Sequence, residues 1–187
     1  MARAQQEEPP SEAYPSLMIT DLDWTLWPMD VDTDVTPPFR KEGGKVLDKY
    51  GATCPLFPDT RRVLEDLKQH GVTIAYASRT TDGDAAEALL KAHDLWGFLD
   101  GNRDLFQAYP SGGVGAKTRH FAEIYKSTNL SACDTIFFDD MEDNVAVASA
   151  SGVICAMVGR REGLTFKHYQ DSLRRWRERE AQGKKKG

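Results

Sequence analysis

Two aspartates separated by a single residue stand directly after a short apolar run near the start of the sequence. The stretch reads LMITDLDWTLWP, so Asp21 and Asp23 flank Leu22, and Thr25 follows. An apolar strand gains nothing from two carboxylates at its end, so either chemistry or a turn must account for them. Taken alone, the pair also fits a turn or a helix cap.

Other polar side chains end later apolar runs in the same way. Ser78 ends VTIAYAS, and Asp139 with Asp140 ends DTIFFDD. Both runs are compatible with buried strands. In a parallel sheet the carboxyl ends of the strands meet at one edge, which is where ligands bind. We therefore expect these hydroxyl and carboxylate groups to gather at a single edge.

Helical patterns separate the apolar runs. They are RRVLEDLKQHG, GDAAEALLKAHDL, AKTRHFAEIYKST and MEDNVAVASASG, and LTFKHYQDSLRRWRERE follows a last apolar run, VICAMV. Strands that alternate with helices favour βαβ crossovers. The predicted fold class is α/β: a Rossmann-like parallel sheet with helices on both faces. The stretch WPMDVDTDVTPPFRKEGG, rich in Pro, Asp and Gly, is expected to be irregular.

The length of 187 residues suits one domain with a substantial core. Residues 1–16 are polar and rich in Pro and Glu, which predicts a flexible lead-in. The domain itself is expected over residues 17–180. Residues 181–187 contain a short lysine run and are expected to form a basic, flexible tail.

Several carboxylates at one edge would repel one another unless a cation lay among them. An all-oxygen site suits a hard ion such as Mg²⁺, which commonly works beside substrate phosphate. Phosphate chemistry is therefore the leading interpretation of the edge. Each group alone has an ordinary alternative, because Ser78 could cap the next segment and Lys117 could be a solvent-exposed helix residue.

The motifs DLDWT, YASRT, the lysine of GAKTRHF and FFDDMEDN resemble, in this order, the four motifs of the haloacid dehalogenase superfamily of aspartate-nucleophile phosphatases. The longer stretches DLDWTLWPMDVDTDVTPPF, HFAEIY and IFFDDMEDN are similar to the magnesium-dependent phosphatase family within it. That resemblance implies an HAD-like fold. No insertion in the sequence is large enough to form a full cap domain.

The resemblance also implies how the first motif works. Asp21 would be the nucleophile that forms an aspartyl-phosphate, and Asp23 would be the acid–base group for both steps. Thr25 would hold the loop in shape. Asp140 and Asp143 would be carboxylates that orient water around the metal.

Later motifs would hold the phosphoryl group and the ion. Ser78 would hydrogen-bond a phosphoryl oxygen, and Lys117 would neutralise charge on the phosphoryl group and the nucleophile. Asp139 would bind Mg²⁺ together with the nucleophile's carboxylate and the backbone carbonyl of Asp23. Arg79 is a predicted substrate contact, with a surface ion pair as its alternative.

The resulting prediction is a Mg²⁺-dependent phosphomonoesterase. Its expected substrates are phosphotyrosine proteins, sugar phosphates, or both. The alternative is a non-catalytic phospho-acceptor or binding module on the same fold. A receiver domain fits less well, because its first strand would carry an adjacent pair of acids rather than a spaced pair.

Composition argues against several other functions. The formal net charge is -5, so no strong basic field favours nucleic acid. No apolar run is long enough to span a bilayer, and the polar start does not resemble a signal peptide. The three cysteines show no CxxC spacing, so neither a disulfide framework nor a zinc site is expected. A monomer in the cytoplasm is predicted, with the nucleus as a second location.

Overall fold

The centre of the protein is a five-stranded parallel sheet, seen in a computed structural model that describes residues 13–111 and 117–184. Its strand order is β5-β4-β1-β6-β7. The strands are β1 (Leu17–Thr20), β4 (Thr73–Ser78), β5 (Phe106–Ala108), β6 (Thr135–Asp139) and β7 (Ile154–Met157). The predicted α/β class with a parallel sheet is confirmed.

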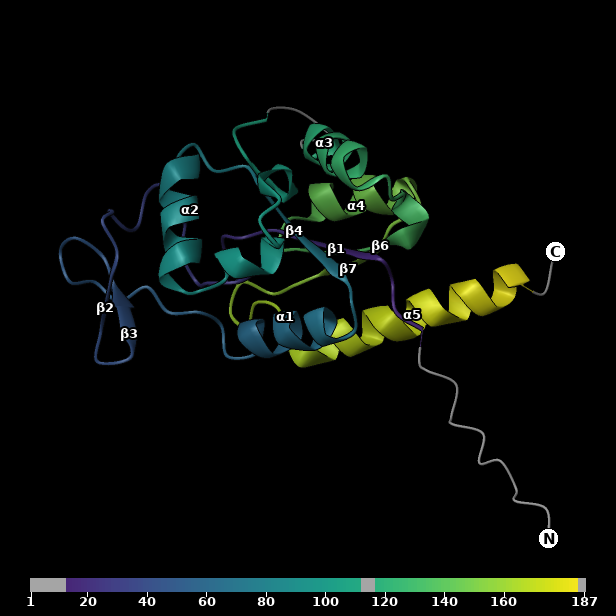
Figure 1. Cartoon of the computed structure of the whole chain (residues 1–187), viewed down its shortest axis with the longest axis horizontal. Coiled ribbons are helices and arrows are strands. Elements are labelled where there is room, and N and C mark those ends of the chain that lie inside the picture. Colours follow the sequence, from purple (N-terminus) through teal and green to yellow (C-terminus); the bar gives the residue numbers. More distant parts are fainter. Residues whose placement is uncertain (1–12, 112–116, 185–187) are drawn as a thin grey trace, which may run out of the picture.

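Helices cover both faces of this sheet, as predicted. Figure 1 shows α1 and α5 below the sheet and α3 and α4 above it. The helices are α1 (Thr60–Gln69), α2 (Gly83–Ala92), α3 (Thr118–Thr128), α4 (Glu142–Ala150) and α5 (Phe166–Lys184). Three short 3-10 helices accompany them: η1 (Trp96–Leu99), η2 (Arg103–Leu105) and η3 (Ala132–Asp134).

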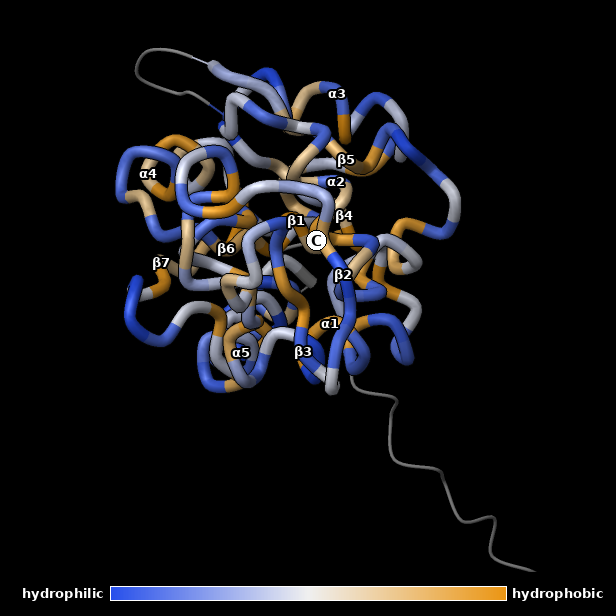
Figure 2. Tube along the Cα trace, turned by 90° about the vertical axis from the view of Figure 1, so that its left-hand side faces the viewer, coloured by the Kyte–Doolittle hydropathy of each residue, from blue (hydrophilic) through white to orange (hydrophobic). Residues whose placement is uncertain are grey.

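The apolar runs form the middle of the sheet because both of its faces are covered. Every residue of β1 and of β6 is buried, which is typical of strands in a parallel sheet between helical layers. Helix α1 places Val63, Leu64 and Leu67 in the core on one stripe. Figure 2 accordingly shows the central strands largely in orange and the outer loops largely in blue.

The register of the sheet sets the position of the first motif. Thr20, the last residue of β1, lies level with Tyr76 of β4 and with Phe138 of β6. The chain continues in line for one more residue, since the Asp21 N–H donates to the Phe138 carbonyl at 2.9 Å. Asp21 thus leaves the sheet between the ends of its two neighbouring strands.

A two-stranded antiparallel hairpin begins within the stretch that we expected to be irregular and ends just after it. It consists of β2 (Arg40–Glu42) and β3 (Lys45–Leu47) and stands apart from the main sheet beside α2 (Figure 1). All three residues of β2 are charged and exposed, so no alternation of apolar and polar residues marks the strand. The pair Gly43 and Gly44, both at positive φ, was the available signal, because such a pair favours a tight hairpin turn.

The sequence also gave no indication of β5, which pairs with β4 at the edge of the sheet. It has three residues, all only half-buried. Such a short segment lacks a periodicity that could distinguish a strand from a loop.

The predicted domain boundaries of 17 and 180 stay predictions. Most of the expected lead-in, residues 1–12, and part of the expected tail, residues 185–187, lie outside the described residues. Of the remainder, Tyr14 stacks on His70 with ring centroids 3.9 Å apart. Helix α5 continues to Lys184, so residues 181–184 are helical.

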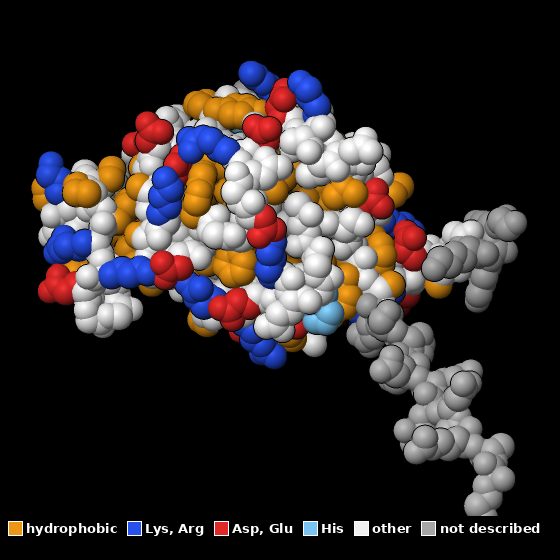
Figure 3. Space-filling view, viewed as in Figure 1, with side chains coloured by type: hydrophobic (Ala, Val, Ile, Leu, Met, Phe, Trp, Pro, Cys, Tyr) orange, Lys and Arg blue, Asp and Glu red, His pale blue; other side chains and the backbone are white. Residues whose placement is uncertain are grey.

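Charges of both signs share the visible face of the molecule. On the face seen in Figure 3, Lys and Arg side chains are interspersed with Asp and Glu side chains rather than collected in one patch. Among the described helices, none combines the length and the apolar character needed to cross a bilayer.

Candidate active site

A cavity of about 140 Å³ lies where β4, β1 and β6 end. Six residues were predicted to contact the substrate or to bind the metal directly, and five of them line this cavity, namely Asp21, Asp23, Ser78, Arg79 and Lys117. The sixth, Asp139, is fully buried beside the cavity and accepts a hydrogen bond from Lys117, which lines it. The structure therefore brings all six together, although they are spread over more than one hundred residues of sequence.

Lys117 links the carboxylates that come from two different strands. It stands directly before α3, and its side chain is 3% exposed. Its Nζ donates to Asp21 Oδ1 and, at 2.6 Å, to Asp139 Oδ2. Burial lowers the pKa of the Lys117 amine, but the carboxylates of Asp139 and Asp21 outweigh it and leave the pKa raised. A permanent ammonium thus occupies the centre of the site.

Burial shifts the pKa of Asp21 in the opposite direction. It raises the pKa of the Asp21 carboxyl well above its usual value, and the adjacent Lys117 ammonium counteracts this effect. The neighbouring charge of Asp139 adds to the increase. A carboxylate at Asp21 therefore depends on the positive charge around it. The Thr25 hydroxyl contributes a long hydrogen bond, 3.4 Å, to Asp21 Oδ2.

Asp139 is held by the start of α4. Its Oδ1 accepts hydrogen bonds from the Met141 N–H at 2.7 Å and from Asn144 Nδ2 at 3.0 Å. Asn144 Nδ2 also lies 3.0 Å from Asp139 Oδ2. The side chain of Asn144 is buried, and its Oδ1 has no hydrogen-bond partner among the described residues. An unpaired buried acceptor beside the carboxylates is suited to a water or a metal-bound water.

Three carboxylates could hold a metal ion in this cavity. One oxygen each from Asp21, Asp139 and Asp140 lies within 4.8 Å of the others. Oxygen ligands of this kind suit Mg²⁺, and the orphaned acceptor on Asn144 is a further polar group at the same place. The residues therefore fit the ion that the sequence predicted, with Asp140 in the cluster. Asp143 is exposed and is not part of this group.

The Asp23 carboxyl lines the cavity but is not one of the three clustered carboxylates. Its Oδ1 accepts from Trp27 Nε1 at 2.7 Å and from the Val31 N–H at 3.1 Å. Burial raises the pKa of Asp23 to about 7, even though both hydrogen bonds lower it. Asp23 can therefore exchange a proton near neutral pH. Trp24, between the two aspartates, has a φ of 57° and lines the cavity.

Ser78 and Arg79 form the opposite wall. The Ser78 side chain is buried, and its Oγ accepts from the Thr80 N–H at 3.2 Å. Its hydroxyl hydrogen remains available to a ligand. Arg79 is half-buried, and its Nε has no hydrogen-bond partner among the described residues. Its Nη1 lies 3.8 Å from the Met141 sulfur. Among the described residues, no carboxylate forms an ion pair with this guanidinium.

The family model described as Acid Phosphatase matches residues 13–179. The chain belongs to this family. It is 39% identical over 142 residues to Magnesium-dependent phosphatase 1 of Homo sapiens, covering 75% of this chain and 76% of the relative. A HAD-like hydrolase superfamily protein of Schizosaccharomyces pombe is 33% identical over 137 residues, covering 70% of this chain and 78% of that protein.

Solved structures agree on the fold. A HAD-superfamily hydrolase from Ehrlichia chaffeensis superposes with a TM-score of 0.57 at 15% identity, covering 89% of this chain and 98% of that chain. The resemblance to the magnesium-dependent phosphatase family is confirmed, and the chain is a phosphatase. The alternative of a non-catalytic module finds no support in these relatives.

Several contacts of the phosphatase site were not predicted from the sequence. Asp32 Oδ2 accepts from the Thr81 N–H at 2.9 Å and from Thr81 Oγ1 at 2.7 Å, which joins the first-motif loop to the segment after β4. Arg160 pairs with Asp140 at 2.7 Å and stacks over Trp24. These partners are far apart in the sequence, and no local pattern relates them.

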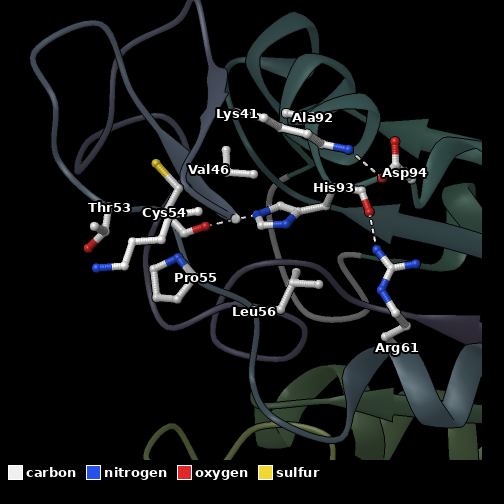
Figure 4. A pocket seen from close by; sticks show the side chains of 12 residues that line it. Lys41, Val46, Thr53, Cys54, Pro55, Leu56, Arg61, Ala92, His93 and Asp94 are labelled. Carbon is white, nitrogen blue, oxygen red and sulfur yellow. Dashed lines mark hydrogen bonds and ion pairs between the residues drawn. The ribbon is translucent and has the colours of Figure 1, made fainter.

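A second cavity of about 640 Å³ lies beneath the hairpin, between β3 and the end of α2. Figure 4 shows two paired groups on its walls: Lys41 with Asp94, and Arg61 with the carbonyl of His93. His93 Nε2 donates to the Cys54 carbonyl at 2.8 Å. None of the six predicted site residues lines this cavity. These contacts anchor the hairpin to the phosphatase domain.

Proposed function

We propose that this phosphatase hydrolyses phosphomonoesters through an aspartyl-phosphate on Asp21, with Mg²⁺ as its cofactor. The arrangement that supports this proposal most directly is one buried ammonium, Lys117, between the carboxylates of Asp21 and Asp139. A phosphoryl group that approached Asp21 would meet this ammonium and the Ser78 hydroxyl in one cavity. Positive charge fixed in advance where negative charge develops is the main source of catalysis in phosphoryl transfer.

In the first step an Asp21 carboxylate oxygen attacks phosphorus, and the bond from phosphorus to the ester oxygen breaks. The leaving oxygen takes a proton from Asp23, whose pKa of about 7 allows it to carry one near neutral pH. Ser78 would donate its hydroxyl hydrogen to a phosphoryl oxygen. Lys117 would offset the charge of the phosphoryl group and of the nucleophile.

In the second step the ionised Asp23 removes a proton from a water molecule. The water oxygen bonds to phosphorus, and the bond from phosphorus to Asp21 breaks. Inorganic phosphate leaves, Asp21 is again a carboxylate, and Asp23 again carries its proton. One side chain therefore serves as acid and then as base, which requires a pKa near the working pH.

The magnesium ion would be held by the carboxylates of Asp21 and Asp139, with Asp140 as a neighbouring ligand or water-orienting group. The backbone carbonyl of Asp23 completes the set proposed from the sequence. When bound, the ion supplies positive charge to the phosphoryl oxygens and to the nucleophile. Burial raises the pKa of Asp21, so this added charge also favours the reactive carboxylate.

For substrates we propose phosphotyrosine proteins, sugar phosphates, or both. The insertion after the first motif forms only a small hairpin anchored beside α2, which leaves bulky phosphoesters access to the cavity. Arg79 is a half-buried cation without a carboxylate partner among the described residues, and it would contact a substrate oxygen. The monomeric state and the cytoplasmic or nuclear location stay predictions, open to gel filtration and cell fractionation.

The test is turnover of p-nitrophenyl phosphate with Mg²⁺, with excess EDTA, and after Mg²⁺ is restored. We expect activity to be lost with EDTA and regained with Mg²⁺. Full activity in EDTA would refute the proposed cofactor. A panel of sugar phosphates beside phosphotyrosine peptides, compared by kcat/KM, would then decide between the two substrate classes.

A further inference from the structure

His120 is a buried histidine that takes no part in the reaction steps proposed above. It lies in the first turn of α3, three residues after Lys117, and it is fully buried. Its Nε2 lies 2.8 Å from the Ser78 carbonyl and 3.2 Å from the Tyr109 carbonyl. A carbonyl can only accept a hydrogen bond, so Nε2 carries the hydrogen and donates it.

We infer that His120 is a positioning residue, which fixes the distance between the Ser78 hydroxyl and the Lys117 ammonium. The two groups come from different parts of the fold, the end of β4 and the start of α3. The His120 hydrogen bond joins these two parts directly. The inference rests on the proposed roles of Ser78 and Lys117 in the phosphatase reaction.

A second partner makes this connection rigid. The His120 ring stacks on Tyr109, with centroids 4.1 Å apart and planes inclined by 13°. The Tyr109 N–H in turn donates to the Ser78 carbonyl at 3.2 Å. The Ser78 carbonyl therefore accepts from both His120 and Tyr109. Because the carbonyl is fixed from two sides, the backbone that carries the Ser78 hydroxyl is held in place relative to α3.

The charge state of His120 agrees with a positioning role. Burial lowers the pKa of His120 to about 4, and the nearby Lys117 ammonium contributes to the decrease. The ring is thus neutral at neutral pH, so it adds no charge of its own beside the Lys117 ammonium. His120 Nδ1 has no hydrogen-bond partner among the described residues. The remaining ring nitrogen, Nε2, makes the connection to Ser78.

The experiment compares His120→Gln, which keeps an N–H donor of similar reach, with His120→Leu, which keeps the volume and loses the donor. Phe121→Leu is the matched control. Phe121 is the next residue of α3, is buried and packs edge-on against Phe137, with ring centroids 4.9 Å apart. Its phenyl ring has no hydrogen-bonding group, so its truncation loosens the packing of α3 without removing a hydrogen bond to Ser78.

Each variant is measured for its melting temperature, for kcat and KM with p-nitrophenyl phosphate, and for inhibition by inorganic phosphate. We expect His120→Leu to lower kcat about 10- to 100-fold, because small displacements of positioned groups have effects of this size. Inhibition by phosphate should weaken as well. His120→Gln should recover most of both values, and Phe121→Leu should lower only the melting temperature.

Ser78→Ala distinguishes a failure of the role inferred for His120 from a failure of the role proposed for Ser78. If Ser78→Ala impairs phosphate binding and His120→Leu keeps full kcat and full phosphate inhibition, the role of His120 is refuted and the proposed site stands. If Phe121→Leu lowers kcat as much as His120→Leu does, the effect comes from helix packing, and the positioning role is also refuted. A fully active Ser78→Ala enzyme would overturn the proposed role of Ser78 together with this inference.

Discussion

The indole Nε1 of Trp27 donates a hydrogen bond to Asp23 Oδ1 at 2.7 Å, and Trp27 is itself fully buried. Together with the Val31 N–H it holds one oxygen of the carboxyl group. Among the described residues none donates a hydrogen bond to Oδ2 of Asp23. Trp27 therefore orients the proposed acid and leaves its second oxygen available for proton exchange.

The pH dependence of kcat/KM should reflect this arrangement. The free enzyme needs protonated Asp23 to protonate a poor leaving group, and burial raises the pKa of Asp23 to about 7. We expect kcat/KM for phenyl phosphate to fall as the pH rises above about 7, and to fall less for p-nitrophenyl phosphate, whose leaving group hardly needs a proton. The measurement is a pH–rate profile for both esters.

Trp27→Phe provides the sharper comparison. The Trp27 hydrogen bond lowers the pKa of Asp23, so its loss should raise that pKa and move the falling limb to higher pH. Profiles that stay flat to pH 9 for both esters would contradict the assignment of Asp23. A limb that moves to lower pH in Trp27→Phe would contradict the role of the indole.

Much of the fold could be read from the sequence, because its central strands are short apolar runs between clear helical patterns. The runs at β1, β4 and β6 are buried on both faces, and this burial leaves a direct mark on composition. The hairpin and β5 leave no such mark. β2 consists of exposed charged residues, and β5 is a half-buried edge strand of three residues.

The site also has parts that the sequence indicates and parts that it does not. Carboxylates and a hydroxyl at strand ends follow from the topology, so the sequence could indicate Asp21, Ser78 and Asp139. The supporting hydrogen bonds could not be predicted in the same way. The roles of Trp27 and His120 carry no mark in the sequence, because their partners depend on side-chain directions that no sequence spacing determines.

Removal of the Asp139 side chain should act mainly on the metal. Asp139 is one of three carboxylates that could share the ion, so Asp139→Ala should raise the Mg²⁺ concentration needed for half-maximal activity, and added Mg²⁺ should partly restore turnover. The measurement is a Mg²⁺ titration of kcat beside the exposed Glu142→Gln control. An unchanged half-saturation in Asp139→Ala would remove Asp139 from the metal site.

The stability of the protein should fall in mild acid partly because of His120. Its pKa is lowered to about 4 in the folded state, against a usual value of about 6.5 in the unfolded chain. Between these values the unfolded state binds more protons, so the free energy of unfolding decreases as the pH falls from 7 to 5. For this residue the loss is on the order of 1 to 2 kcal/mol.

His120→Gln removes that titrating group. Urea unfolding at pH 5 and pH 7 should therefore show a smaller pH effect in His120→Gln than in the wild type. Equal pH effects in the two proteins would show that His120 ionises alike in the folded and the unfolded chain.

Gly163 should tolerate no side chain. Its φ is +61°, and a Cβ atom there would lie 2.0 Å from Cδ2 of Phe57. We expect Gly163→Ala to lower the free energy of unfolding by about 2 to 4 kcal/mol, through backbone strain and overpacking. Leu164 donates to the Thr25 carbonyl at 2.8 Å, so the first-motif loop should also be disturbed and kcat should fall.

The matched control for this prediction is Gly97→Ala. A Cβ atom at Gly97 would meet nothing within 4 Å, and its φ is not in the left-handed region. The Gly97→Ala substitution should change the free energy of unfolding by no more than about 0.5 kcal/mol. Denaturant titrations of both variants test the pair, and similar values for the two would contradict the close approach of Gly163 to Phe57.

The roles of the two first-motif acids can be separated by the fate of the phosphoryl group. Asp21→Asn replaces the carboxylate by an amide, which is a poor nucleophile, so turnover should be abolished and no covalent phosphate should form. Asp23→Asn keeps the attacking carboxylate and removes the acid–base group. With p-nitrophenyl phosphate the first step should still occur, because the leaving group is good.

The good leaving group of p-nitrophenyl phosphate does not assist the second step, because it has already departed. Without a base to take the proton from water, hydrolysis of the aspartyl-phosphate in Asp23→Asn should slow by about 10²- to 10⁴-fold. Mass spectrometry after an acid quench during turnover should then find phosphate on Asp21 in Asp23→Asn and no adduct in Asp21→Asn. Phosphate on Ser78, or an active Asp21→Asn enzyme, would overturn the mechanism, because the nucleophile would then have to be a group other than the carboxylate that Lys117 contacts.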